Sequence, residues 1–158
     1  KGGWYGSPFT LGVNLTAKWK NFTFFALGTG NFGAYGLKNN SYWWVKGDGK
    51  YSAVVRNRWT EATKETATYP RLTTLSGSNN YQTSDFWMYS TDAFRLAKVQ
   101  ITYDLPSMLF QKTWVKGFSA YVSGANLLTI SKNRELLEMN IGSAPQTRYY
   151  NIGVKATF

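Results

Sequence analysis

The sequence predicts an all-β fold, consisting of about five C-terminal strands of a large antiparallel transmembrane β-barrel with long extracellular loops. Three observations predict it. Several stretches of about ten residues alternate apolar and polar side chains, as a strand between lipid and a wet lumen must. Aromatic residues make up 18% of the 158 residues, and helix-favouring runs are scarce. Finally, tight turns alternate along the chain with long connections.

Residues 9–19, FTLGVNLTAKW, give the clearest strand pattern. The apolar side chains share one face, and an aromatic residue stands at each end of it: Phe9, Leu11, Val13, Leu15, Ala17 and Trp19. Lys20 and Asn21 then predict a short turn into a second strand at residues 22–30. In that strand Phe24 and Phe25 stand side by side and obscure the alternation.

Three more strands follow with the same pattern. Residues 95–105 place Ala97, Val99 and Ile101 on the apolar face, and Pro106 ends the strand because it has no backbone N–H to donate. Residues 118–128 and 148–158 alternate in the same way, and the last of these strands finishes at Phe158. The long connections fall at about residues 31–94 and 129–147, whereas short ones follow Trp19 and Leu105.

The pattern also predicts which side chains face lipid and which face the lumen. The lipid set is Leu11, Val13, Leu15, Val99, Ile101, Val122, Ile152 and Val154. The lumen set is Asn14, Lys18, Gln100, Ser123, Asn151 and Lys155. A soluble sandwich would alternate too, with its apolar face turned inward. Lysines inside the polar pattern and the alternation of short and long connections favour the barrel.

The composition argues against most catalytic and metal sites. The chain has no Cys and no His, so thiolate chemistry, imidazole acid–base chemistry and the usual zinc ligands are missing. We therefore expect no catalytic residues, no metal and no cofactor. The net charge of +10 is dispersed along the chain. It is typical of a solvated rim or of contact with lipopolysaccharide phosphates and lipid headgroups, and it does not favour nucleic acid.

Two motifs that resemble known sites have simpler explanations. GTGNFG at residues 28–33 matches the G-x-G-x-x-G motif of dinucleotide-binding sites. That site also requires a helix directly after the motif together with an acidic residue about 20 positions further on, and the sequence does not show this combination. Glu61 and Glu65 could be imagined as a glycosidase pair, yet with Lys64 between them they are more typical of a solvated face with ion pairs.

Aromatic residues of the first long connection are candidates for contact with a substrate or a lid. They are Tyr42, Trp43, Trp44, Trp59 and Trp87. Their rings offer the stacking surface that a sugar-binding loop uses, but the pattern is more typical of aromatic residues that pack a long loop onto the barrel rim or lie in the interface belt. We expect this loop to be extracellular, with a short helix within residues 51–59.

Three segments resemble SusC/RagA-like TonB-dependent transporters. They are SDFWMYSTDAFRLAKVQITYDLP at residues 84–106, YVSGANLLTISK at residues 121–132 and RWTEATKETATYPRL at residues 58–72. The terminal aromatic Phe158 is similar to the signal by which the barrel assembly machinery recognises its clients. The chain departs from the family pattern at Ala97 and Lys98, and Glu135 and Glu138 stand where an Asp-Pro-Glu is common.

The resemblance implies a part of an active nutrient importer in the bacterial outer membrane. It implies residues 1–158 as the C-terminal part of the barrel, with the plug domain and the remaining strands elsewhere. The implied partners are a SusD-like surface lipoprotein, TonB, membrane lipid with lipopolysaccharide, and an oligosaccharide or oligopeptide substrate. A soluble carbohydrate-binding β-sandwich module and a passive porin-type barrel remain as alternatives.

Overall fold

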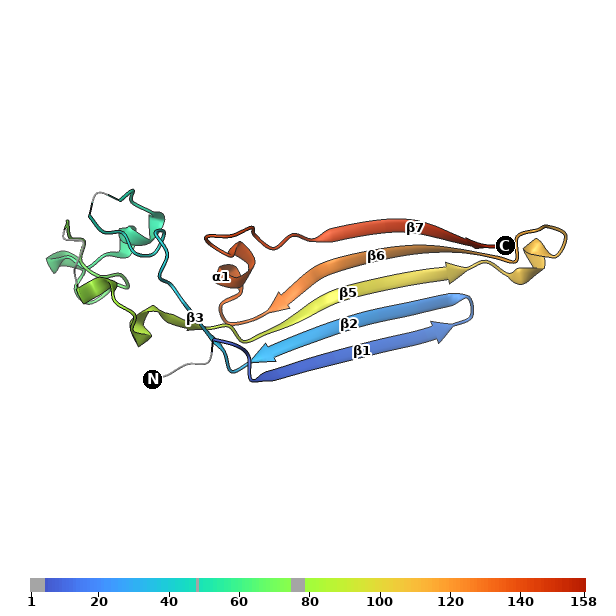
Figure 1. Ribbon diagram of the computed structural model, residues 1–158, viewed down its shortest axis with the longest axis horizontal. Helices are drawn as coiled ribbons and strands as arrows, with labels where there is room; N and C mark the ends of the chain where they lie inside the picture. Colours follow the sequence, from blue (N-terminus) through green and yellow to red (C-terminus); the bar gives the residue numbers. More distant parts are fainter. Residues whose placement is uncertain (1–4, 48, 75–78) are drawn as a thin grey trace.

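A computed structural model describes residues 5–47, 49–74 and 79–158. Its main element is one antiparallel sheet of five strands in the order β1-β2-β5-β6-β7 (Figure 1). The strands are β1 (Phe9–Trp19), β2 (Phe22–Phe32), β5 (Ala93–Asp104), β6 (Gly117–Ile130) and β7 (Tyr149–Thr157). The predicted strands are therefore all present, with ends shifted by one or two residues except in the first, which agrees fully.

The connections differ strongly between the two ends of the sheet. Lys20 and Asn21 join β1 to β2, and the positive φ of Lys20 (50°) suits a tight hairpin turn. The β5–β6 connection, predicted to be short, is longer than a tight turn because it includes the 3₁₀ helix η5 (Ser107–Phe110). The long β2–β5 and β6–β7 connections lie at the opposite end (Figure 1).

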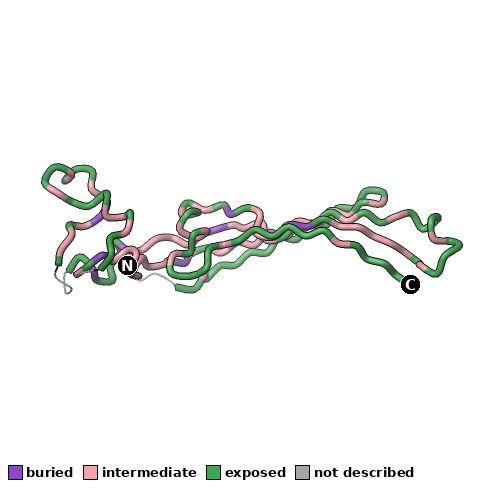
Figure 2. Tube along the Cα trace, turned by 90° about the horizontal axis from the view of Figure 1, so that it is seen from above, coloured by how far each residue is buried: buried purple, intermediate pink, exposed green. Residues whose placement is uncertain are grey.

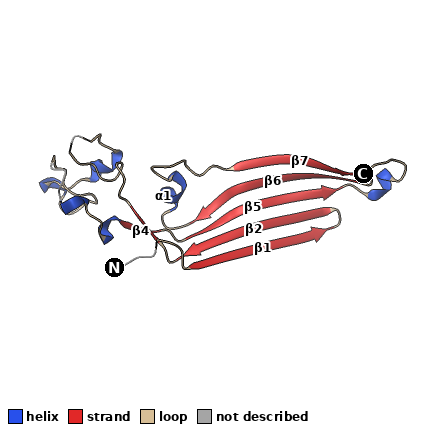
Figure 3. Cartoon of the chain, viewed as in Figure 1, coloured by secondary structure: helices blue, strands red, loops and turns tan. Residues whose placement is uncertain are grey.

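The helical elements lie only in the connections (Figure 3). The β2–β5 connection contains β3 (Tyr35–Leu37), η1 (Ala53–Asn57), η2 (Glu61–Thr63), η3 (Asn79–Tyr81), η4 (Asp85–Trp87) and β4 (Met88–Ser90). The short helix expected within residues 51–59 is thus the 3₁₀ helix η1. The β6–β7 connection contains α1 (Arg134–Met139). No described helix is long and apolar enough to cross a membrane.

The register places apolar side chains on one face of all five strands. Leu15 pairs with Ala26, which pairs with Val99, and Ile101 pairs with Val122, which pairs with Ile152. Of the predicted lipid set, all but the half-buried Val99 are exposed, up to 85% for Ile152. The outer strands β1 and β7 are exposed along nearly their whole length, whereas the interior strands are mainly half-buried (Figure 2). The predicted apolar face is confirmed, and it is not buried between two sheets as a sandwich requires.

The opposite face carries the predicted polar set. Gln100 pairs with Ser123 and Ser123 with Asn151, while Lys155 pairs with Ser119. Asn14 pairs with Leu27 and Lys18 with Thr23, so these side chains share the same face. The prediction missed Phe25 and Leu27, which add apolar area to this face.

A bulge changes the predicted alternation in the middle of the sheet. Between Leu96 and Lys98 the register of β5 shifts against both neighbours: Ala97 is the extra residue relative to β2, whereas relative to β6 the extra residue lies on β6. Ala97 was predicted on the apolar face, but Leu96 and Phe94 take those positions instead. On β6 the same irregularity includes Asn126, whose φ is 55°. A bulge changes the face of the sheet to which the following side chains point. A strict alternation of apolar and polar residues cannot predict this change.

Aromatic rings lie over glycines on both faces of the sheet. A side chain at Gly28 would overlap the ring of Phe94, and one at Gly153 would overlap the ring of Tyr121. The glycines therefore make room for large rings from the neighbouring strand. Such pairs help to hold one register across an otherwise exposed sheet.

The exposed face leads to a first prediction. In the full-length protein Ile152→Lys should lower the free energy of unfolding in lipid vesicles by about 2–4 kcal/mol, because a lysine near the middle of a lipid-facing strand must enter hydrocarbon. The neighbouring change Asn151→Lys, on the polar face, is the control and should cost far less. Denaturant titration of both variants measures the difference, and equal costs would mean that the apolar face does not contact lipid.

Candidate functional site

The β2–β5 connection has a hydrophobic core of its own, made mainly of aromatic side chains. Tyr69, Tyr81 and Trp87 are the buried members, each at most 5% exposed, and Trp43 and Trp44 pack against them. The ring centroid of Trp87 lies 5.8 Å from that of Tyr69, 6.2 Å from that of Tyr81 and 6.2 Å from that of Trp44. We call these five residues the aromatic cluster. It gives the loop a fixed shape beyond the end of the sheet.

Hydrogen bonds inside the cluster satisfy most of its polar atoms. The Tyr69 hydroxyl donates to the carbonyl of Trp43 at 2.7 Å and accepts from the amide of Val45 at 3.2 Å. The Trp87 indole Nε1–H donates to the carbonyl of Asn80 at 2.9 Å. Burial, assisted by the neighbouring Tyr69 hydroxyl, raises the pKa of Tyr81 well above its ordinary value. The buried Tyr81 hydroxyl therefore stays protonated more firmly than an exposed one would.

Asn40 positions the three consecutive aromatic residues that follow it. Its side-chain Oδ1 accepts from the amide of Tyr42 at 3.1 Å. Its backbone carbonyl accepts from the amides of Trp43 and Trp44 at 3.0 and 2.9 Å. The resulting turn points the neighbouring rings of Tyr42 and Trp43 in different directions. They meet edge to face, with ring centroids 5.0 Å apart. Asparagine suits this role because its short side chain readily caps the following backbone.

A pocket of about 280 Å³ opens beside the cluster. Trp43, Tyr69 and Trp87 supply aromatic wall, and Lys38, Asn57 and Thr68 supply polar groups. The Lys38 Nζ lies 5.0 Å from the ring centroid of Trp43, a distance suited to a cation–π contact. The pocket thus combines aromatic rings with a cationic and several polar groups, the kinds of group that orient a ligand in a binding pocket.

A second hollow lies next to Trp44. Asn39, Ser41, Lys46 and Lys50 are among its lining residues. The Trp44 Nε1–H is buried and has no hydrogen-bond partner within the described ranges. A buried donor without a partner is uncommon in folded proteins.

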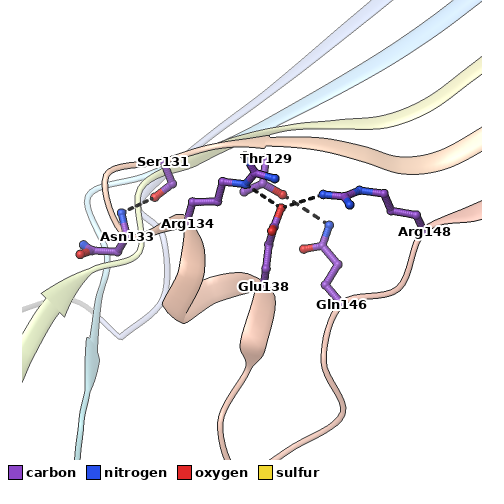
Figure 4. Close-up of polar contacts among 7 residues, drawn as sticks. All are labelled: Thr129, Ser131, Asn133, Arg134, Glu138, Gln146 and Arg148. Carbon is purple, nitrogen blue, oxygen red and sulfur yellow. Dashed lines mark hydrogen bonds and ion pairs between the residues drawn. The ribbon is translucent and has the colours of Figure 1, made fainter. Parts of the chain in front are cut away.

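The β6–β7 connection is held by a polar network centred on Glu138 (Figure 4). Its Oε1 accepts from Arg134 Nε at 3.0 Å and from Arg148 Nη2 at 3.4 Å. The backbone amide of Gln146 donates to the backbone carbonyl of Glu138 at 2.8 Å. The side-chain amide of Gln146 donates to the Thr129 hydroxyl at 3.4 Å. The hydrogen bond from Arg134 keeps the pKa of Glu138 below its ordinary value. The network ties both ends of the connection to the end of β6.

The two long connections also contact each other. The side-chain amide of Asn40 donates to the carbonyl of Ile141 at 2.9 Å, and that of Asn133 donates to the carbonyl of Ser90 at 2.8 Å. Ser131 donates to the carbonyl of Asp92. The β6–β7 connection therefore supports the aromatic loop where it leaves the sheet.

The structure brings four of the five predicted aromatic candidates together. Tyr42, Trp43, Trp44 and Trp87 meet in or beside the aromatic cluster, whereas Trp59 lies outside it beside the Arg58–Tyr69 bridge. Trp87 is only 3% exposed, so its side chain packs the loop, while Tyr42, Trp43 and Trp44 stay half-buried. Phe158 is far from this site and stacks on Trp114 with centroids 4.6 Å apart. The roles of these residues in substrate contact and assembly stay predictions.

Sequence reasoning missed Asn40, Tyr69 and Tyr81 as parts of the site. Asn40 lies in an Asn-Asn-Ser triplet, and turn chemistry is a signal that could have identified it. Tyr69 stands in the Tyr-Pro-Arg segment that carries the family resemblance. Tyr81 has no local signal, because its burial depends on Trp87 and on distant partners.

Comparison with known proteins gives a consistent relationship. No family model matches the chain. It is 28% identical, over an alignment 177 residues long, to TonB-dependent receptor P26 of Formosa agariphila, and the alignment covers 97% of this chain and 17% of that protein. It resembles the RagAB peptide importer in the 'closed-closed' state with 28% identity and a TM-score of 0.73, and in the 'open-open' state with 26% identity and a TM-score of 0.71. Both matches cover 96% of this chain and 17% of the solved chain.

These findings confirm the predicted fold class and resemblance. The chain spans about 17% of the length of the curated relative that it matches. It resembles SusC/RagA-like TonB-dependent transporters, and its sheet is a section of an outer-membrane β-barrel. The apolar face is thus the lipid-facing side and the polar face the lumen side.

The aromatic cluster leads to a second prediction. Trp87→Ala should destabilise the β2–β5 connection by about 3–5 kcal/mol, because it removes a large ring from the centre of a packed core. Amide hydrogen exchange in residues 38–47 and 53–69 should accelerate, while exchange in β5 and β6 should not change. Trp59→Ala, outside the cluster, is the matched control, and similar exchange in both variants would argue against the cluster as the core of the loop.

The Glu138 network leads to a third prediction. A carboxylate with a lowered pKa stabilises the folded loop above its ordinary pKa, and this contribution is lost as the pH falls through the lowered value. Glu138→Gln should remove the contribution at neutral pH and raise amide exchange in residues 131–148 by a factor of a few, since exposed ion pairs are weak.

Glu135→Gln is the matched control because Glu135 is exposed on the same helix. Exchange corrected for its intrinsic pH dependence should distinguish wild type from Glu138→Gln at neutral pH and not at strongly acidic pH. A difference that persists at acidic pH would contradict the assignment to the Glu138 carboxylate.

Proposed function

We propose that this chain is the C-terminal part of the barrel of an outer-membrane nutrient importer that is energised through TonB. The observation that carries the proposal is the five-stranded sheet with one lipid-facing and one polar face, which matches the RagAB peptide importer over 96% of the chain. In this proposal the chain is not catalytic. It contributes barrel wall and extracellular loops.

The two outer strands of the sheet support the proposal that further barrel strands lie beside it. Among the described residues, β1 and β7 are outer strands with one neighbour each. In hydrocarbon an unpaired backbone N–H or C=O costs several kcal/mol, so spanning sheets close on themselves. Further strands therefore pair with β1 and β7, and a plug domain occupies the lumen that the polar face lines.

The proposed partners follow from the same resemblance. A SusD-like surface lipoprotein covers the loop end of the barrel, and TonB acts from the other side through a segment outside this chain. The long β2–β5 connection, with its fixed aromatic cluster, stands where such a lid or its cargo would meet the barrel. Phe158, on the lipid side at the short-turn end, suits recognition by the assembly machinery.

The proposed substrate is an oligopeptide or an oligosaccharide. RagAB is named as a peptide importer, which favours the first. The pocket beside Trp43 favours neither class on its own, because aromatic walls with Lys38 and Asn57 suit a sugar ring as well as a peptide group. Uptake assays with both classes on the full-length protein distinguish them.

The structure disfavours the two alternative functions to different degrees. A soluble carbohydrate-binding sandwich needs two sheets packed face to face, but the large sheet here leaves its apolar face exposed. A passive porin shares this wall, but the similarity to a TonB-dependent receptor favours active import.

The site leads to a fourth prediction. Trp43→Ala should weaken substrate capture by the full-length importer about fivefold, which corresponds to about 1 kcal/mol of lost ring stacking. Trp43→Phe keeps an aromatic ring over the pocket and should retain most of the affinity. The measurements are uptake at several substrate concentrations and the surface level of each variant.

Tyr51→Ala is the control, since Tyr51 is 72% exposed and is not among the residues lining this pocket. If Trp43→Ala reaches normal surface levels and imports like the control, Trp43 only packs the loop.

A further inference from the structure

The lipid-facing side of the sheet ends in aromatic rings at its short-turn end. Trp19 and Phe22 stack with centroids 6.4 Å apart, and Phe22 meets Tyr103 at 4.7 Å. Lys20 lies 5.0 Å from the ring centroid of Trp19. Aromatic rings with a nearby cation at a strand end are typical of the boundary between hydrocarbon and headgroups.

The β5–β6 connection continues beyond this boundary and is unusually apolar for an exposed segment. Met108 and Leu109 in η5 are 76% and 63% exposed, and Trp114 is 76% exposed. Exposed large apolar side chains that gather on one segment mark a contact surface. The sheet next to them already contacts lipid, so this surface continues an interface that the fold establishes.

Trp114 lies on the lipid side of the sheet. Its ring stacks on that of Phe158 at 4.6 Å with an angle of 14° between the planes. Phe158 continues the alternation of Val154 and Ala156, whose side chains face lipid. The amide of Lys116 donates to the carbonyl of Thr157 at 2.7 Å, which holds the end of the connection against β7. The end of the connection is thus fixed beside the lipid-facing side of β7.

The charges of the connection suit a lipid headgroup layer. Residues 105–116 contain Lys112 and Lys116 and no Asp or Glu. Both lysines are exposed. Basic side chains beside exposed apolar ones are typical of segments that lie in the plane of an interface, where the lysines reach lipid phosphates.

We propose that the β5–β6 connection is an in-plane membrane anchor. Met108, Leu109 and Trp114 lie at the boundary of the acyl chains, and Lys112 and Lys116 bind phosphates of the periplasmic leaflet. The proposal rests on the proposed function, because it requires the sheet to span the outer membrane.

Site-directed spin labelling tests the anchor, helped by the lack of Cys in this chain. Nitroxides are placed at Met108→Cys and Leu109→Cys in the full-length transporter, with any cysteine elsewhere replaced. The protein is reconstituted in vesicles of phosphatidylethanolamine and phosphatidylglycerol. Collisions with oxygen, which concentrates in lipid, are compared with collisions with a water-soluble nickel chelate.

Two reference labels calibrate the result. Ile152→Cys reports the middle of the lipid face, and Lys64→Cys, on an exposed loop side chain, reports water. For the anchor, both test labels should be more protected from nickel and more accessible to oxygen than Lys64, with ratios between those of Lys64 and Ile152, because the boundary of the acyl chains is shallower than the middle of the lipid face. Trp114→Ser should shift the Met108 label toward the ratio of Lys64.

Each other outcome overturns the proposal in a recognisable way. If the test labels behave like Lys64 while Ile152 is in lipid, the anchor is wrong and the barrel stands. If Ile152 also collides freely with nickel, the membrane-spanning sheet and the anchor are both wrong. If Trp114→Ser leaves the Met108 label unchanged, Trp114 does not hold the segment in the interface.

Discussion

The structure depends on one constraint, the need to pair every backbone N–H and C=O of a strand that crosses hydrocarbon. Four antiparallel ladders satisfy the interior strands β2, β5 and β6 on both sides. Because the ladders set the register, they also decide which side chains face lipid and which face the lumen. A shift by one residue would turn the apolar face of a strand toward water. The rings of Phe94 and Tyr121 over neighbouring glycines help to keep that register.

A sheet with lipid on one side cannot supply an ordinary hydrophobic core, and the burial pattern reflects this. Most of the buried large side chains lie in the β2–β5 connection, around Trp87, rather than between the strands. The aromatic cluster therefore lets a long loop hold a defined shape beyond the membrane. Asn40 links this loop to the β6–β7 connection through Ile141, and the network around Glu138 and Gln146 anchors that connection to β6.

The two ends of the sheet thus differ in the side chains and interactions that they present to their surroundings. At the loop end, hydrogen bonds and ion pairs organise segments that stand in water and offer a pocket beside Trp43. At the short-turn end, large aromatic and aliphatic side chains such as Trp114 are exposed instead. The sheet therefore has an ordered, polar loop region at one end and exposed apolar side chains at the other.

The sequence by itself determined the strands, their faces and the likeness to TonB-dependent transporters, because a period of two and a few motifs are local properties. The bulge at Ala97 was not visible, since it depends on how β5 meets both of its neighbours. The aromatic cluster was only half predicted. Its members Trp44, Tyr69 and Trp87 are apolar wherever they stand, but their packing against one another arises when a long connection folds back. Contacts such as Asn40 with Ile141 join residues far apart in the chain, and only the tertiary structure decides them, because no local pattern encodes which distant groups meet.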